Sequence, residues 1–130
     1  MKRFIKFGLV GISGFLVDVG VLYLFISFWD PYTSRAISFA SAIFVTWLLN
    51  RNFTFKGTNS QLSLTFEFIA YFGLMFFGGA VNLLVYAVLT ATNFLVAQYP
   101  IFGVAAGSIA GLFVNFIISS RLFSKAIQHK

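Results

Sequence analysis

Long apolar runs separated by short polar segments dominate this chain, and four of them reach the length of a membrane span. A spanning helix needs about 20 mostly apolar residues. The runs that meet this requirement cover residues 7–28, 34–53, 66–91 and 100–123. The pattern therefore predicts an all-α integral membrane protein, with four transmembrane helices in a single membrane domain over residues 1–130.

The segments between the predicted spans are short and polar. In the first, we expect Pro31 to end one helix and Thr33 or Ser34 to cap the next. The second connection, residues 56–61, is polar and flexible, and the third, near residues 92–100, carries no charge.

The charged residues are few and lie mostly at one end of the predicted spans. The chain is 59% hydrophobic and 9% charged, which is too little charge to cover a water-facing surface. Arg35 lies on one side, and on the other lie Lys2, Arg3, Lys6, Arg51, Lys56, Arg121, Lys125 and Lys130. The positive-inside rule therefore predicts that both termini are cytoplasmic. Because these cations flank apolar spans, the net charge of +6 indicates anionic lipid rather than nucleic acid as a partner.

The two halves of the chain resemble each other. A shift of 64 residues places Gly14 on Gly78 and Asp18 on Asn82, and a shift of 70 places Arg51 on Arg121. Each half contains two spans, so the pattern predicts two parallel two-helix repeats related by an axis along the membrane normal. Transporters commonly hold their substrate at the interface of such repeats.

Small residues on the fourth span indicate close helix packing. Gly103, Gly107 and Gly111 lie four residues apart on one face, which lets another backbone approach closely in lipid. Two interpretations remain open. The face either packs within the chain or forms the seam of a homo-oligomer.

Polar side chains inside the spans are candidates for a transport path. Asp18 is expected near the middle of the bilayer, where an ionised carboxylate is costly unless it faces the bundle interior or is protonated. Asn82 is its repeat equivalent, and Asn115 lies at a similar depth. These groups either line a path for a hydrophilic headgroup, together with Trp47, or form hydrogen bonds between helices.

Two arginines at equivalent positions are candidates for phosphate binding. Guanidinium groups match phosphate oxygens in a bidentate geometry. Arg51 and Arg121 can therefore clamp one phosphate or diphosphate, or they serve only as topological anchors. Asn50 adds a donor beside Arg51, and Lys6 is expected to meet lipid phosphate. Arg3 is a further candidate for phosphate binding and is expected near Glu67 at the inner surface.

Several motifs together resemble the GtrA-like family. They are the opening Arg3-Phe4-Ile5-Lys6-Phe7 with Gly11, the ending Asn50-Arg51-Asn52-Phe53-Thr54-Phe55, and the later Asn115-Phe116 and Arg121. The ending is the most specific. One departure is Leu122-Phe123-Ser124, where the family commonly has an aromatic residue before x-Phe.

The resemblance implies a role in cell-surface polysaccharide synthesis at the bacterial inner membrane. Members are thought to translocate polyprenyl-phosphate-linked sugars, such as undecaprenyl-phosphate glucose, made by a partner polyprenyl-phosphate glycosyltransferase. The products include modified O-antigen. Alternatives are a non-transporting anchor or recruiter of that glycosyltransferase, a small multidrug exporter and a holin. The uneven distribution of Lys and Arg argues against an exporter of cationic drugs. A holin would not explain Asp18 or the internal repeat.

The sequence shows none of the patterns that an enzyme or a metal site would need. The chain has no cysteine, no phosphate-cradling glycine loop and no catalytic set of serine, histidine and aspartate. Its single histidine, His129, lies in a charged tail. We therefore expect no catalytic activity and no cofactor.

Overall fold

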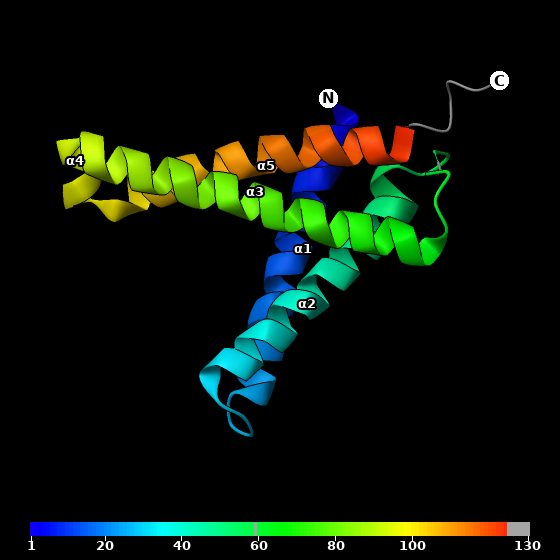
Figure 1. Cartoon of the computed structure of the whole chain (residues 1–130), viewed down its shortest axis with the longest axis horizontal. Coiled ribbons are helices and arrows are strands. Elements are labelled where there is room, and N and C mark those ends of the chain that lie inside the picture. Colours follow the sequence, from blue (N-terminus) through cyan, green and yellow to red (C-terminus); the bar gives the residue numbers. More distant parts are fainter. Residues whose placement is uncertain (59, 125–130) are drawn as a thin grey trace. The chain divides into compact units, whose positions relative to one another are not determined.

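The computed structural model describes residues 1–58 and 60–124, which are mostly helical, with no β-strand among them. In chain order the elements are α1 (Lys2–Phe25), α2 (Pro31–Leu49), the π-helical turn η1 (Asn50–Thr54), α3 (Leu64–Thr92), α4 (Phe94–Gln98) and α5 (Pro100–Ser124) (Figure 1). Three residues named in the sequence analysis lie outside the described residues: Lys125, His129 and Lys130.

Three of the helices are long and apolar enough to cross a membrane. They are Lys2–Phe25, Leu64–Thr92 and the part of α5 from Ile101 to Phe123. These correspond to the first, third and fourth predicted spans, and α1 begins five residues earlier than expected. The second predicted span coincides with α2 and η1, and α2 has 19 residues. Four spans therefore remain a prediction, whereas an all-helical, multi-pass membrane protein is confirmed.

The turn between α1 and α2 differs from the expectation in its capping residue. Asp30, rather than Thr33 or Ser34, is the N-cap of α2, because its carboxylate accepts a hydrogen bond from the Thr33 amide at 2.9 Å. Pro31 is the first residue of α2, whereas α1 already ends at Phe25, so the expectation that Pro31 ends the first helix is wrong. Proline suits the first helical position because its missing N–H would have no intrahelical acceptor there.

The chain forms two compact units, each of which is described by itself. Unit 1 contains Met1–Phe68 together with the segment from Phe123, and unit 2 contains Ile69–Leu122. In unit 1, α1 packs against α2 through its buried face of Phe7, Val10 and Gly14. The single domain over residues 1–130 stays a prediction.

The Asn50-Arg51-Asn52-Phe53-Thr54-Phe55 motif folds as the π-helical turn η1. The Phe55 amide donates to the Asn50 carbonyl at 2.8 Å, which is the i to i+5 bond of a π-turn. The Thr54 hydroxyl donates to the Asn50 side-chain oxygen at 2.7 Å inside the same turn. π-turns are rare and often mark functional positions, since they change the direction in which side chains leave a helix.

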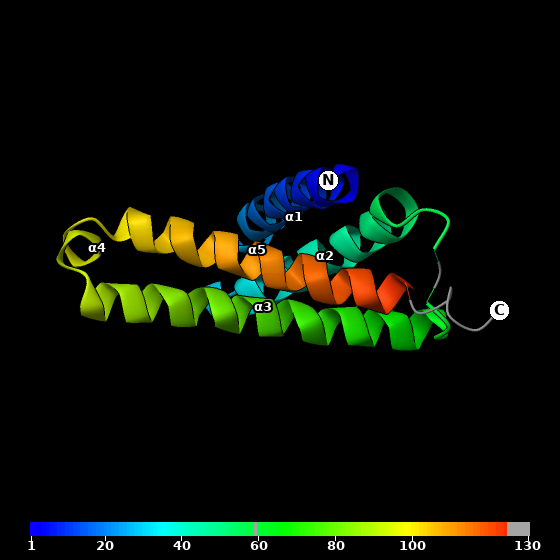
Figure 2. The ribbon, with the colours of Figure 1, turned by 90° about the horizontal axis from the view of Figure 1, so that it is seen from above.

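In unit 2, α3 and α5 run antiparallel and lie side by side, joined by the short helix α4 (Figure 2). The glycine face of α5 is used inside this pair. A Cβ on Gly107 would lie 2.5 Å from the Asn82 carbonyl oxygen, and one on Gly111 would lie 2.9 Å from the Gly78 carbonyl oxygen. The structure therefore favours intrachain packing over a seam between copies as the role of this face.

The repeat predicted from the sequence stays a prediction, although each half does contain a helical hairpin. Asp18 and Asn82, equivalent under the shift of 64 residues, each face the second helix of their own hairpin. The two cationic ends differ, however. Arg51 lies in a π-turn, whereas Arg121 lies in the last turn of the α-helix α5.

Candidate functional site

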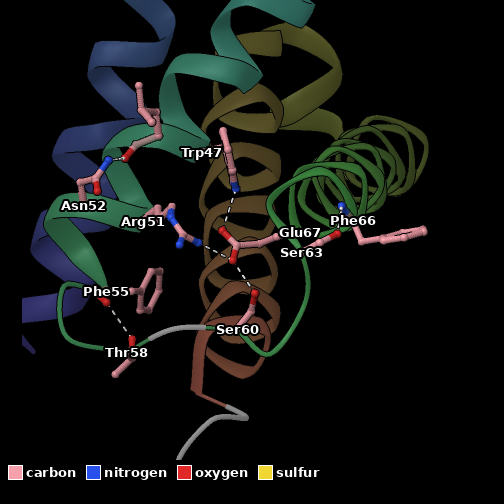
Figure 3. A network of polar contacts seen from close by, with 10 residues as sticks. Trp47, Arg51, Asn52, Phe55, Thr58, Ser60, Ser63, Phe66 and Glu67 are labelled. Atoms are coloured by element: carbon pink, nitrogen blue, oxygen red, sulfur yellow. Dashed lines mark hydrogen bonds and ion pairs between the residues drawn. The ribbon is translucent and has the colours of Figure 1, made fainter.

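A buried glutamate at the beginning of α3 organises the polar residues around η1. Glu67 is fully buried, with no exposed surface. One of its oxygens accepts a hydrogen bond from the Trp47 indole N–H at 3.0 Å. The other accepts from Arg51 Nη1 at 2.6 Å and from the Ser60 hydroxyl (Figure 3). Side chains from α2, η1 and the loop before α3 thus meet at the carboxylate of Glu67 on α3.

The ion pair of Arg51 with Glu67 is partly open on the arginine side. The Arg51 side chain is 24% exposed, whereas that of Glu67 is 0% exposed. Only Nη1 of Arg51 contacts Glu67, and its Nε and Nη2 have no acceptor within the described residues. Because a guanidinium has five N–H donors in a planar fork, Arg51 keeps donors for a second oxyanion.

This network departs from the sequence-based expectation for Glu67. Arg3 was expected near Glu67, but Arg51 is the arginine that pairs with it. Arg3 is exposed at the start of α1. The expected Arg3–Glu67 pair is therefore wrong, and one predicted phosphate ligand, Arg51, already has an internal anion as its partner.

Aromatic rings connect η1 to the two termini. Lys6 lies over the Phe53 ring, with its ammonium 4.8 Å from the ring centroid. Phe55 is fully buried, meets Phe7 edge-on at 6.4 Å and stacks on Phe123 at 4.9 Å. The stack places the end of η1 against the end of α5.

The remaining residues predicted to contact the substrate differ in exposure. Asn50 is 1% exposed and accepts the Thr54 hydroxyl, so in this conformation it stabilises the π-turn. Trp47 is also buried, and its ring packs against Phe44 and Phe68 at 5.8 and 5.2 Å. Arg121 is exposed in the last turn of α5.

Asp18 has a cationic partner, which the sequence analysis did not anticipate. Arg35 Nη1 lies 2.6 Å from both oxygens of the Asp18 carboxylate. Asp18 is about 24 Å from the start of α1 and about 10 Å from its end at a rise of 1.5 Å per residue. It therefore lies nearer the α1–α2 turn than the start of the helix, and its charge is neutralised within the hairpin.

The Asp18–Arg35 pair predicts an asymmetric response to mutation. The Asp18 side chain is 16% exposed and that of Arg35 is 56% exposed. Arg35→Ala should lower the yield of folded protein, because an uncompensated aspartate inside a span costs about 2.5–3.5 kcal/mol. Asp18→Asn should have a smaller effect, because the long Arg35 side chain can reach the interface. Size-exclusion chromatography of detergent-solubilised protein measures both.

The same experiment contains its own control. The double variant Arg35→Ala with Asp18→Asn should recover most of the folded yield, since it no longer leaves a lone carboxylate. A normal yield for Arg35→Ala alone would show that the pair contributes nothing to folding.

In unit 2, Asn82 and Asn115 occupy the space left by glycines on the facing helix. Asn82 lies against Gly107 and Gly111 of α5, and Asn115 lies against Gly78 of α3. The Asn115 side-chain oxygen is buried and has no hydrogen-bond partner within the described residues. The interface between α3 and α5 therefore contains two amides, at least one with unused hydrogen-bonding capacity.

The comparison with protein families matches almost the whole chain. Residues 6–123 fit the family described as GtrA/DPMS, transmembrane domain. The chain belongs to this family. A comparison with curated proteins gives no match.

Membership in the GtrA/DPMS family confirms the resemblance inferred from the motifs. The matched region includes η1, Glu67 and both hairpins. It identifies a membrane protein whose function is related to polyprenyl-phosphate sugars. The Arg51 guanidinium in this region is 24% exposed, and guanidinium groups form charge-assisted hydrogen bonds with phosphate oxygens.

Proposed function

We propose that this protein translocates a polyprenyl-phosphate-linked sugar, such as undecaprenyl-phosphate glucose, across the bacterial inner membrane. The observation that carries the proposal is Arg51, a partly exposed guanidinium with unused donors in a GtrA/DPMS-family chain. The headgroup would move from the cytoplasmic to the outer leaflet. There it would be used to modify O-antigen or a similar surface polysaccharide.

Phosphate recognition is assigned to the cations around η1 and the ends of α1 and α5. Arg51 and Arg121 would bind the phosphate oxygens, while Lys6 and Arg3 would raise the local positive potential. The 24% exposure of the Arg51 side chain supports its part in this assignment. Asn50 would act by holding the π-turn that presents Arg51.

The polar residues inside the helices are assigned to passage of the sugar. Asp18, Asn82 and Asn115 would exchange hydrogen bonds with the sugar hydroxyls, and Trp47 would contribute once its indole is uncovered. The unpartnered Asn115 oxygen supports this assignment, since an unused acceptor suits a hydroxyl donor. The prenyl chain would remain in lipid beside the helices.

Topology and partners complete the proposal. The eight-to-one distribution of cations supports cytoplasmic termini and an inner-membrane location. A polyprenyl-phosphate glycosyltransferase would supply the lipid-linked sugar at the cytoplasmic face. The long helices carry many exposed apolar side chains, which form surfaces that lipid, that enzyme or another copy can contact.

Reconstitution tests transport directly. Purified protein in liposomes containing radiolabelled undecaprenyl-phosphate glucose should make the inner-leaflet sugar accessible to membrane-impermeant periodate, which cleaves vicinal diols. Liposomes without protein provide the baseline. If the fraction oxidised stays at about the outer-leaflet half in both preparations, the transport proposal is wrong.

The alternative function, anchoring or recruiting a glycosyltransferase, gives a different result in the same system. Stable co-purification of that enzyme without any headgroup movement would support anchoring. The glycine face of α5 does not favour this alternative, because α3 already covers it.

A further inference from the structure

Arg51 and Glu67 form a pair in which one member is fixed and the other can move. Glu67 is fully buried on α3, whereas Arg51 is 24% exposed and sits on the π-turn η1. The arginine side chain is long and flexible, so it can reorient toward the surface without disturbing a helix. The Glu67 side chain cannot move to the surface without opening the buried interior of unit 1 to its surroundings.

The carboxylate keeps two hydrogen bonds that do not depend on Arg51. The Trp47 indole N–H donates to one oxygen, and the Ser60 hydroxyl donates to the other. A buried carboxylate is costly when it loses its cation, and remaining donors reduce that cost. The site is therefore built to tolerate a Glu67 that is temporarily without its arginine.

The chemistry of the two candidate anions is similar. A carboxylate and a phosphate both accept short, charge-assisted hydrogen bonds from a guanidinium. Glu67 occupies Nη1 of Arg51 at 2.6 Å in the structure, which is the place one phosphate oxygen would take in a bidentate contact. A phosphate bound end-on through Nη1 and Nη2 therefore competes with Glu67 for Nη1, whereas a phosphate bound side-on through Nε and Nη2 would leave the pair intact.

We propose that Glu67 is an internal competitor for Arg51, and that a prenyl-linked phosphate binds by drawing Arg51 away from it. This inference rests on the proposed function and adds a mechanism to the same site. In the ligand-free state the pair holds η1 to the start of α3. Ligand binding releases that contact, so phosphate recognition loosens the attachment of η1 to the first turn of α3 within unit 1.

Trp47 reports directly on the state of Glu67. The chain has two tryptophans, and Trp29 stacks on Phe25 in the α1–α2 turn, where phenylalanine can replace it. In a Trp29→Phe background, farnesyl phosphate should change the Trp47 emission in a saturable way, because the carboxylate at its indole N–H loses its cation. Inorganic phosphate at higher concentration should give the same change, and farnesol should give none.

A charge-neutral variant tests the competition. Glu67→Gln keeps the shape of the side chain and removes the attraction for Arg51, so farnesyl phosphate should bind about tenfold more tightly, within the range usual for coupled sites. Asp30→Asn is the matched control, because it is also an acid-to-amide change and asparagine is an equally good N-cap. It should leave the affinity unchanged.

Each result decides the inference. Tighter binding by Glu67→Gln or a phosphate-dependent Trp47 response supports it. Unchanged or weaker binding by a folded Glu67→Gln variant overturns it, since Glu67 would then position Arg51 for the ligand. If that variant does not fold, the titration of Trp47 emission in the protein that retains Glu67 is the deciding measurement. Radiolabelled farnesyl phosphate that binds without a change in Trp47 emission refutes the inference. A Trp47 response without headgroup movement in liposomes would instead refute only the transport proposal.

Discussion

Arg51→Ala should have two separable effects, one on stability and one on transport. Removing the cation leaves Glu67 buried without its counter-charge. Breaking a fully buried pair costs about 3–5 kcal/mol, and the loss here should be smaller, because Arg51 is partly exposed and Trp47 and Ser60 still donate to the carboxylate. Losing a charge-assisted contact to phosphate should also lower headgroup movement by roughly tenfold to a hundredfold. Thermal unfolding in detergent and periodate accessibility in liposomes measure the two effects.

A double variant separates them. Arg51→Ala with Glu67→Gln should regain most of the lost stability, because no buried charge is left unpaired, and it should remain defective in transport. Arg51→Lys keeps the charge without the planar fork and should fall between the wild type and alanine in transport. Full transport by the stable double variant would remove Arg51 from the phosphate site.

Gly107→Ala should destabilise the α3–α5 hairpin by about 1–3 kcal/mol, as overpacking commonly does. Its Cβ would lie 2.5 Å from the Asn82 carbonyl oxygen, and a backbone atom in a helix cannot move aside cheaply. The change in unfolding midpoint in a denaturing detergent titration measures the effect.

The adjacent surface of α3 offers a matched control for this variant. Nothing lies within 4 Å of a Cβ built on Gly79, so Gly79→Ala should be neutral or slightly stabilising through its better helix propensity. Equal unfolding midpoints for the two variants would contradict the close approach of α3 and α5. Loss of an oligomer in Gly107→Ala without loss of monomer stability would instead support a seam between copies.

The positions of the helices were largely predictable from the sequence, since apolar length determines a membrane span. The predicted range 100–123 nearly coincides with α5, and 66–91 lies within α3. The π-turn was not predictable in the same way. Composition indicates a helix over residues 34–53, but it does not distinguish an i to i+4 from an i to i+5 hydrogen bond.

The two ion pairs were missed for a related reason. Glu67 and Arg51 are 16 residues apart and separated by a loop, and both Arg3 and Arg51 are expected at the same membrane surface, so the sequence does not distinguish them as partners of Glu67. Asp18 and Arg35 are 17 residues apart on opposite sides of a tight turn. An antiparallel hairpin centred on that turn brings both side chains to nearby depths, and the length of arginine spans the remaining offset. The Asp18–Arg35 pair was therefore predictable from the spacing of the two residues around the turn.

The length of α3 has a consequence for the membrane in which the protein works. Its 29 residues extend about 43 Å, well beyond a hydrocarbon core of about 30 Å. Such a helix must tilt, thicken the bilayer locally or extend into the headgroup layer. Because Glu67 lies in its first turn, we expect changes in acyl-chain length to alter the depth at which Arg51 and Glu67 lie in the membrane. Bilayer thickness should then change how readily Arg51 meets the headgroup layer.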